Sequence, residues 1–331
     1  MLDLVLGLPG QLEEGARLAG KVALGRPARF DRVVIAGMGG SGIGGNLCRG
    51  LLQDESEVPL LLCQDYDLPK TVTASSLFLA ISYSGNTEET LSAFGHARRR
   101  GCRIIAVTTG GELGRQALLD GNPVVALPPG MPPRAALGYL FSAQLVLLAR
   151  MGIGAEPRRK IAETARFLKR RTRAWRRKAK LVARELAGRL PLVYSTSRLL
   201  DAVADRWRCQ FNENAGVMCH TSQFSEHNHN EIVGMGNPGY LARRSVVVAL
   251  LGPETHTRNR MRLGYMLKIA RAGYAGALQL ESQGKSRLAH MLSLVMLGDL
   301  VSVELAGLVG KDPMEIKRID MLKRLMTGSR R

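Results

Sequence analysis

The sequence RVVIAGMGGSGIGG occupies residues 32–45 and decides the fold of the chain. Its β-branched residues Val33 to Ile35 favour a strand, and the stretch near residues 43–52 is typical of a helix. Glycines between a strand and a helix let the backbone turn sharply and approach a ligand closely, and the N–H groups at the helix start attract an anion. The stretch therefore predicts a phosphate-binding turn in an α/β fold.

A dinucleotide site is the first alternative, because residues 37–42 match its GxGxxG fingerprint. That site also needs a carboxylate about 20 residues further on, at the end of a second strand. The carboxylates at positions 54, 55 and 57 instead precede the next predicted strand. A hydroxyl-rich segment, SYSGNTEET at residues 82–90, follows the third predicted strand, and Ser82, Ser84 and Thr87 could each donate to one phosphate. No Lys-Ser or Lys-Thr follows the glycines, which excludes a Walker-type loop.

Strand-like and helix-like segments alternate along both halves of the chain, which predicts parallel sheets with helices on both faces. The expected strands lie near residues 32–36, 59–63, 77–81, 103–108, 123–127, 192–195, 246–250 and 275–280. The expected helices lie near residues 43–52, 87–100, 112–119, 135–150, 161–186, 199–211, 258–272, 286–308 and 313–326. A chain of 331 residues exceeds what one core usually holds. We expect an α/β domain at residues 1–152, a connecting basic helix at 153–189 and a second α/β domain at 190–331.

The net charge of +19 is unusual, and the densest basic stretch runs over residues 166–189. Apolar residues recur there every three or four positions, which predicts a buried stripe with the cations on the opposite face. A solvated helix face is the simplest interpretation, and nucleic-acid binding is the alternative. The apolar stretch 135–149 is too short to span a bilayer, and Glu13 and Glu14 argue against a signal peptide. With five cysteines scattered without disulfide or metal spacing, we expect a cytoplasmic protein that does not bind a membrane.

The second half carries groups that could do chemistry. FNENA at residues 211–215 places Glu213 at the end of a helix, where partial burial would raise its pKa and suit it to act as a base. SEHNHNE at residues 225–231 is too polar for a core. A metal site built from Cys219, His220, His227 and His229 is the alternative, but their spacing fits no compact zinc pattern, and we expect no metal.

These motifs resemble those of known sugar isomerases. The stretches at residues 37–42 and 82–87 resemble the two phosphate-binding elements of sugar isomerase (SIS) domains. Four later motifs resemble, in the same order, those of bifunctional phosphoglucose/phosphomannose isomerases: PRAAL at 133–137, FNENA at 211–215, HNEIVG at 229–234 and IDMLK at 319–323. The resemblance covers nearly the whole chain and implies two SIS-type domains.

The resemblance implies aldose–ketose isomerisation of glucose 6-phosphate, with mannose 6-phosphate as a second candidate aldose, to fructose 6-phosphate. It implies that Glu213 moves the proton between C2 and C1 through a cis-enediol and that Arg134 stabilises the developing negative charge. His229 would assist ring opening, with Lys323 near the other oxygen. The implied phosphate contacts are the hydroxyls of Ser41, Ser82, Ser84 and Thr87 and the backbone of Gly39 and Gly40. No cofactor is needed, because the substrate carbonyl already acidifies the proton. The resemblance also implies a homodimer in which the loop that carries His229, called the His loop below, reaches the partner's pocket.

Two positions depart from the family pattern. Gly216 stands where members often have a lysine after the FNENA motif, so any support from that lysine to the glutamate would be absent. Ile316 and Lys317 stand where members can carry Thr-Pro, which leaves the choice of sugar open. A non-catalytic sugar-phosphate sensor, with its basic helix on nucleic acid, is the alternative from another class. An isomerase of amino sugar or heptulose phosphates is a third reading.

Overall fold

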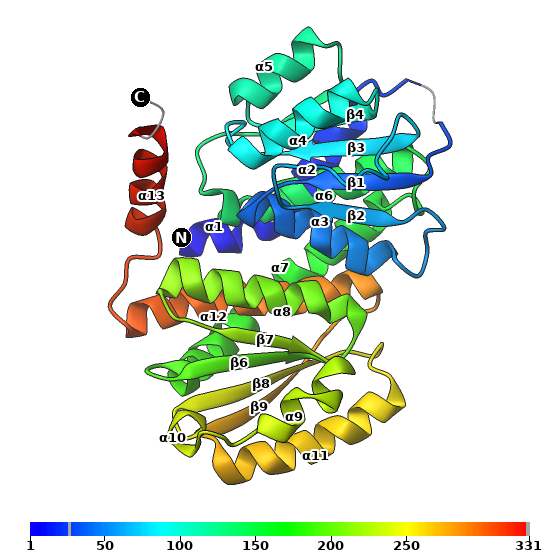
Figure 1. Ribbon diagram of the computed structural model, residues 1–331. Coiled ribbons are helices and arrows are strands. Elements are labelled where there is room, and N and C mark those ends of the chain that lie inside the picture. Colours follow the sequence, from blue (N-terminus) through cyan, green and yellow to red (C-terminus); the bar gives the residue numbers. More distant parts are fainter. Residues whose placement is uncertain (26–27, 329–331) are drawn as a thin grey trace.

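The computed structural model describes residues 1–25 and 28–328 of the chain and contains two parallel sheets with helices between and outside them (Figure 1). The first half holds α1 (Leu2–Leu6), α2 (Leu8–Lys21), β1 (Arg32–Ala36), α3 (Gly39–Leu52), β2 (Leu60–Cys63), β3 (Ser76–Ile81), α4 (Glu88–Arg99), β4 (Arg103–Thr108), α5 (Gly111–Leu119), β5 (Val124–Ala126), η1 (Pro133–Ala135) and α6 (Leu137–Arg150). Its strands pair in the order β2-β1-β3-β4-β5, all parallel.

The second half repeats this plan after the long helix α7 (Arg158–Leu186). It holds β6 (Leu190–Ser195), α8 (Arg198–Gln210), the π-helical turn η2 (Phe211–Ala215), β7 (His220–Gln223), η3 (Glu226–His229), α9 (Glu231–Gly234), α10 (Gly239–Ala242), β8 (Ser245–Leu251), α11 (Thr257–Gly273), β9 (Gly276–Glu281), α12 (Arg287–Leu308) and α13 (Lys317–Gly328). Its strands pair in the order β7-β6-β8-β9, again all parallel.

Both sheets are covered on both faces, which confirms the predicted fold class. Alternate residues of a strand point to opposite faces. In β1, Val33 and Ile35 face the helices between the sheets, whereas Val34 packs in a separate core with Phe94 of α4. In the second sheet, α11 covers the outer face. The core between the sheets is continuous across both halves of the chain.

The basic segment forms one helix with the predicted buried stripe. Ile161, Leu168, Trp175, Val182 and Leu186 of α7 are all buried. This stripe packs against α2 and α12, so that α7 connects the layers of the two halves. The separate predictions of where the domains begin and end, and of nucleic-acid binding by the cationic face, stay predictions.

The glycine run forms a shorter turn than predicted, because the helix expected from about residue 43 begins earlier. Helix α3 begins at Gly39, so that Gly42, Gly44 and Gly45 lie inside the helix. A Cβ at Gly42 would lie 2.3 Å from the carbonyl oxygen of Gly37, and one at Gly45 would lie 2.7 Å from Ile35 Cγ2. These glycines let α3 pack closely on the chain beneath it, and the turn itself is confined to residues 37–38.

The sequence does not predict several elements of the structure. The edge strand β7 consists of His220–Gln223, which has no apolar run because its side chains are exposed or only half-buried. Short helices such as α9 and α10 lack the length at which a period of 3.6 residues can be recognised. The last helix begins at Lys317 rather than near residue 313.

Helix α12 is the one helix among the described residues that is long and apolar enough to cross a membrane. Within the fold, 78% of an apolar 18-residue stretch of this helix is buried. Its apolar side chains pack between the sheets, which is the arrangement of a core helix.

Candidate active site

The two predicted phosphate-binding turns lie next to each other at the carboxyl ends of β1 and β3. Ser41, buried in the first turn of α3, accepts a hydrogen bond of 3.1 Å on its Oγ from the backbone N–H of Tyr83. Ser82 Oγ lies 2.9 Å from Thr87 Oγ1 and accepts a bond of 3.1 Å from the N–H of Gly85. Ser84 is exposed, and its hydroxyl accepts a bond of 3.3 Å from the N–H of Asn86. The structure thus brings the four predicted hydroxyl residues into neighbouring turns.

Close packing at Gly40 connects these turns with Arg134. A Cβ at Gly40 would lie 2.6 Å from the backbone nitrogen of Arg134, so only glycine fits there without displacing η1. Gly39, next to it, is exposed and has a φ of +48°, a conformation that favours glycine. The start of α3 therefore lies directly against the short helix that carries Arg134.

The Arg134 side chain meets Glu213 although the two residues are 79 positions apart. Arg134 is 3% exposed, and its Nη1 lies 3.4 Å from Glu213 Oε2. Its Nε donates to Asn214 Oδ1 at 2.8 Å, and its Nη2 donates to the carbonyl of Pro313 at 2.7 Å. Burial lowers the pKa of Arg134 and the charge of Glu213 raises it, but an arginine with a pKa normally above 12 stays a cation at neutral pH. The half-buried Glu213 carboxylate thus faces a fixed positive charge.

A buried hydrogen-bond network fixes Arg134 from behind. Arg206 donates from Nη2 to the backbone carbonyl of Arg134 at 3.0 Å and forms a two-pronged ion pair with Asp299 at 2.9 and 2.6 Å. The Asp299 carbonyl accepts a 2.7 Å bond from Ser302 Oγ, which in turn accepts a 2.9 Å bond from Asn214 Nδ2. Since Asn214 binds the Arg134 side chain, the network closes into a ring that holds both the backbone and the guanidinium of Arg134.

The missing lysine at position 216 has a substitute from elsewhere in the chain. Gly216 has a φ of +65°, and a Cβ there would lie 3.0 Å from Cδ and 3.2 Å from Nζ of Lys311. The Lys311 ammonium donates a hydrogen bond of 3.2 Å to the carbonyl oxygen of Glu213. Gly216 lacks the family's lysine side chain, but Lys311 occupies the space above it and contacts the backbone of Glu213, so a lysine from another part of the chain lies beside this residue.

His229 lies at the other end of α8 from Glu213. The 13 residues of α8 span about 20 Å, and Glu213 follows its last turn. His229 is exposed in η3, and a surface cavity lined by Arg198 of α8 and Phe224 places the start of this loop beside the first turn of α8. Within one subunit, the described contacts do not bring His229 to Glu213.

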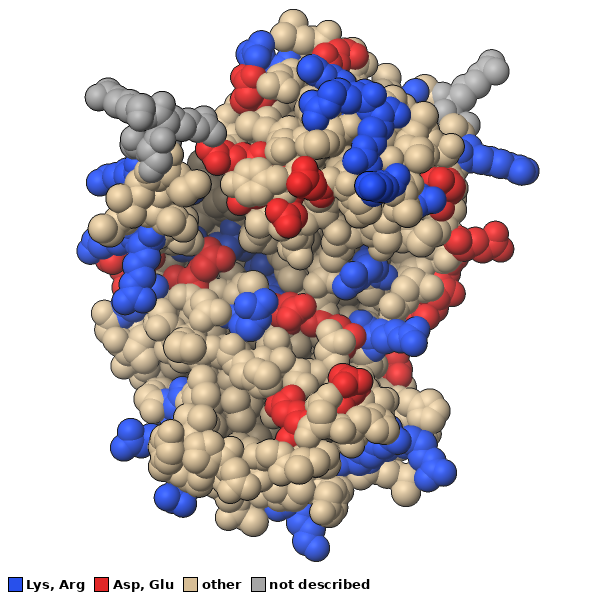
Figure 2. All heavy atoms as spheres, in the orientation of Figure 1, with Lys and Arg blue, Asp and Glu red and all other residues tan. Residues whose placement is uncertain are grey.

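Lys323 lies on α13, which stands beside the first half of the molecule (Figure 1). The segment before α13 is tied to the site, because Pro313 accepts a hydrogen bond from Arg134. Figure 2 shows a hollow between α13 and the body of the molecule, with acidic and basic side chains on its floor. The hollow is open to solvent and has one wall formed by α13.

The loop that carries His229 is anchored by Glu231. Its Oε1 accepts a 2.7 Å hydrogen bond from Tyr194 Oη and lies 3.0 Å from His220 Nε2. Its Oε2 lies 3.6 Å from Nδ1 of the fully buried His227. Burial by itself raises the pKa of Glu231, but hydrogen bonds from these neighbours outweigh it and hold the pKa well below its usual range. Glu231 therefore joins the loop to β6 and β7 as a carboxylate.

No group of three or more metal-ligating side chains lies together within residues 1–25 and 28–328. All five cysteines are free thiols.

The sequence motifs do not identify four residues that lie near the site: Arg206, Asp299, Ser302 and Lys311. A charged residue within an apolar helix could have pointed to Asp299, because a buried charge needs a partner. The partner itself could not be read from the sequence, because Arg206 is 93 positions away.

Comparisons with known proteins find relatives that match nearly the whole chain. Residues 176–326 match the family model described as the bacterial phospho-glucose isomerase C-terminal SIS domain. The chain is 39% identical to the bifunctional phosphoglucose/phosphomannose isomerase of Caldicellulosiruptor bescii over 98% of both chains. It is 36% identical to the protein of the same name from Aquifex aeolicus, over 89% of this chain and 90% of that one.

The fold resembles solved structures at low sequence identity. The C-terminal domain of glucosamine-fructose-6-phosphate aminotransferase from Francisella tularensis superposes with a TM-score of 0.75 at 14% identity, covering 95% of this chain and 98% of that one. This likeness concerns the fold alone, whereas the sequence identity to the two relatives extends over 98% and 90% of their lengths. The chain therefore belongs to the bifunctional phosphoglucose/phosphomannose isomerase family.

Proposed function

We propose that this protein interconverts glucose 6-phosphate and mannose 6-phosphate with fructose 6-phosphate through a cis-enediol. The observation that carries the proposal is the Glu213 carboxylate held 3.4 Å from the buried Arg134 guanidinium, beside two hydroxyl-lined turns. A sugar-phosphate sensor needs the turns but has no use for a carboxylate poised against a fixed cation. Family membership points to the same activity.

Each residue then has a defined task. The hydroxyls of Ser41, Ser82, Ser84 and Thr87 hold the 6-phosphate, helped by the backbone at Gly39 and Gly40. Glu213 takes the proton from C2 of the open-chain aldose, and the electron pair forms the C1–C2 double bond while O1 gains a proton. Glu213 then returns its proton to C1 as the O2 hydroxyl loses one, which gives the ketose. Arg134 stabilises the negative charge on the enediol oxygens.

Use of both aldoses follows from the intermediate. Glucose 6-phosphate and mannose 6-phosphate differ only at C2, which is planar in the enediol. One base can therefore serve both epimers if the C2–C3 bond can present either face. Ile316 stands where a hydroxyl residue can occur in the family, so the ratio of the two aldoses is the property we expect to differ.

The active protein is a homodimer in this proposal. Within one subunit His229 lies at the far end of α8 from Glu213, so ring opening by this residue requires His229 of the partner subunit. Exposed apolar side chains lie both beside His229 and on α13: Val233, Met321, Leu322 and Leu325 are each more than half exposed. Burying them between two subunits would bring the His loop and α13, with Lys323, towards the site. The free cysteines suit the reducing cytoplasm.

The test is hydrogen exchange during turnover. The purified protein is incubated with fructose 6-phosphate in deuterated water, and products and C–H exchange are followed by NMR. We expect both aldose phosphates to form with deuterium at C2, and the Glu213→Gln variant to form neither while still binding fructose 6-phosphate. Absence of exchange in the wild-type protein, with binding intact, would leave only a sensor.

A further inference from the structure

More than half of the net charge of this protein lies on α7. Residues 158–186 contain thirteen Lys and Arg against Glu163 and Glu185, which gives +11 of the total +19. The candidate active site uses none of these cations. A single sugar phosphate also has no need of so much charge at a distance from its site.

A groove of about 460 Å³ lies between α7 and the segment that leads from β9 into α12. Arg166 and Arg170 line it from α7, and Lys285 lines it from the opposite side. Phe167 and Ala289 form an apolar wall. We call this the α7–α12 groove. Its volume is that of a site for a small organic ligand.

The three cations of the α7–α12 groove are not neutralised by the protein. None of Arg166, Arg170 and Lys285 forms an ion pair within the described part of the chain. The one carboxylate on the rim, Glu163, pairs with Arg159 at 3.8 Å. The groove therefore has an uncompensated positive charge.

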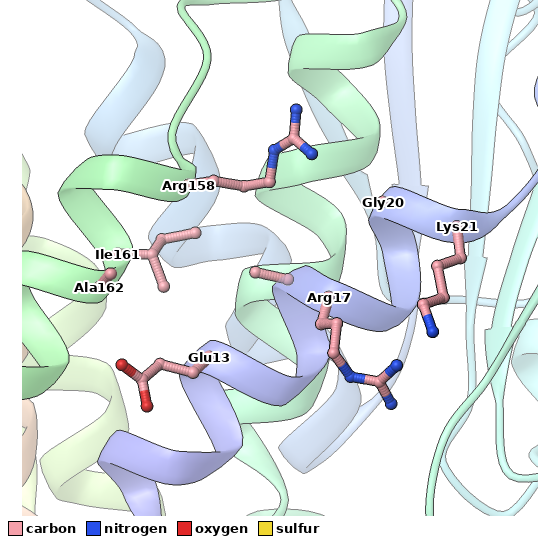
Figure 3. Close-up of a pocket in the computed structure, with 8 residues that line it drawn as sticks. Glu13, Arg17, Gly20, Lys21, Arg158, Ile161 and Ala162 are labelled. Carbon is pink, nitrogen blue, oxygen red and sulfur yellow. The ribbon is translucent and has the colours of Figure 1, made fainter.

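The neighbouring groove between α2 and α7 differs from the α7–α12 groove in the pairing of its arginines (Figure 3). It is of similar size, about 490 Å³, but Arg17 pairs with Glu14 at 2.5 Å and Arg158 pairs with Glu156 at 2.8 Å. In Figure 3 the side chains of Arg17 and Lys21 extend away from Ile161 and Ala162. Of these two grooves, the α7–α12 groove is the one whose arginines form no ion pair among the described residues.

Two further features of the α7–α12 groove favour an anion. Thr164 lines it and is 1% exposed, and its hydroxyl has no hydrogen-bond partner among the described residues. Ser286, also on the wall, caps the 22-residue helix α12, whose positive end faces this side. A hydroxyl donor and a helix N-terminus add to the three cations.

We propose that the α7–α12 groove binds a nucleoside di- or triphosphate. Three cations call for more negative charge than a single phosphate carries, and the apolar wall at Phe167 offers a surface for a base. The groove is separate from the candidate active site: Ser286 and Ser302 are 16 residues apart along α12, about 24 Å. The ligand therefore binds at the same time as the sugar phosphate.

The test uses ADP as the probe in isothermal titration calorimetry at physiological ionic strength, with the full-length protein. The groove variant carries Arg166→Ala and Arg170→Ala. The matched control carries Arg173→Ala and Arg177→Ala, which removes two exposed cations with the same spacing from the same helix but outside the groove. We expect the groove variant to bind ADP at least about tenfold more weakly and the control to bind it nearly as the wild type does.

Saturating fructose 6-phosphate should leave ADP binding unchanged, and so should Glu213→Gln. Equal weakening in both double variants would show a diffuse polyanion effect of α7 and overturn the proposal. Displacement of ADP by fructose 6-phosphate would place it in the sugar site instead, and no binding of ADP to an active isomerase would remove the site altogether.

Discussion

The guanidinium of Arg206 donates a hydrogen bond of 3.0 Å to the backbone carbonyl of Arg134, and both residues are almost fully buried. Arg206 is itself held by Asp299, a carboxylate whose pKa burial raises and Arg206 lowers. A cation that must meet a developing charge is more effective when its position is fixed before the reaction. The ring through Asp299, Ser302 and Asn214 provides that fixation.

Opening this ring at Ser302 should slow turnover. Ser302→Ala removes the hydroxyl that links Asn214 to the Asp299 carbonyl, and should lower kcat roughly tenfold with little change in KM, because Arg134 acts mainly in the transition state. The unfolding free energy should fall by about 1–3 kcal/mol, because the Asn214 amide loses a partner.

Ser293→Ala is the matched control. Ser293 is also a buried serine of α12 whose hydroxyl both donates and accepts, but its partners are His290 and Gln283. It should lose similar stability and keep wild-type kcat. Equal losses of kcat in the two variants would mean that the ring has no positioning role.

Substitution of Gly216 should disturb Glu213 through Lys311. Gly216→Ala introduces a side chain at a φ of +65° and pushes against Lys311, which should cost about 1–2 kcal/mol of stability and reduce kcat. Gly188→Ala is the comparison, since Gly188 has a φ of +71° with open space around its Cβ position. If Gly188→Ala lowers kcat as much as Gly216→Ala does, the contact with Lys311 is irrelevant to activity.

Mixed dimers should reveal whether sites are shared. Glu213→Gln and His229→Ala homodimers should each be nearly inactive. Mixing and reassembling them in equal amounts should restore about one quarter of wild-type activity, because half of the dimers then contain one intact site out of two. Failure of activity to return, with heterodimers verified by mass spectrometry, would confine each site to one subunit.

The anchor of the His loop should weaken as pH rises. The hydrogen bond to Glu231 raises the pKa of His220 above its ordinary value of 6.5, against the opposing effect of burial. The interaction of protonated His220 with Glu231 therefore stabilises the folded protein fully at pH values below 6.5. This stabilisation is lost as the pH rises through the higher pKa that His220 has in the folded state. Glu231 stays charged throughout, because its pKa is well below its usual range.

The difference in Tm between the wild type and Glu231→Gln should accordingly be larger near about pH 5.5 than near about pH 8.5. Part of the difference should persist at the higher pH, because Tyr194 still donates to Glu231. A difference that grows with pH would contradict the assigned charges. The Tm values are measured by differential scanning calorimetry in buffers of equal ionic strength.

The sequence by itself determined the class of the fold and predicted most of the residues of the candidate site. Local patterns did this: β-branched runs such as Val33 to Ile35 form strands, the 3.6-residue stripe of α7 faces the core, and the motifs around Arg134 and Glu213 are short and contiguous. Such signals need only neighbours along the chain.

Only the tertiary structure decided which of these residues meet. The hydrogen bonds that join Arg134 to Asn214, and Arg206 to Asp299, connect positions 80 and 93 residues apart, and Lys311 reaches Glu213 across 98. The polar strand β7 likewise forms because its backbone pairs with β6, since its own residues give no hydrophobic pattern. Pairings of this kind depend on how the helices and sheets pack, because burial requires each polar group to find a partner from whichever segment lies beside it.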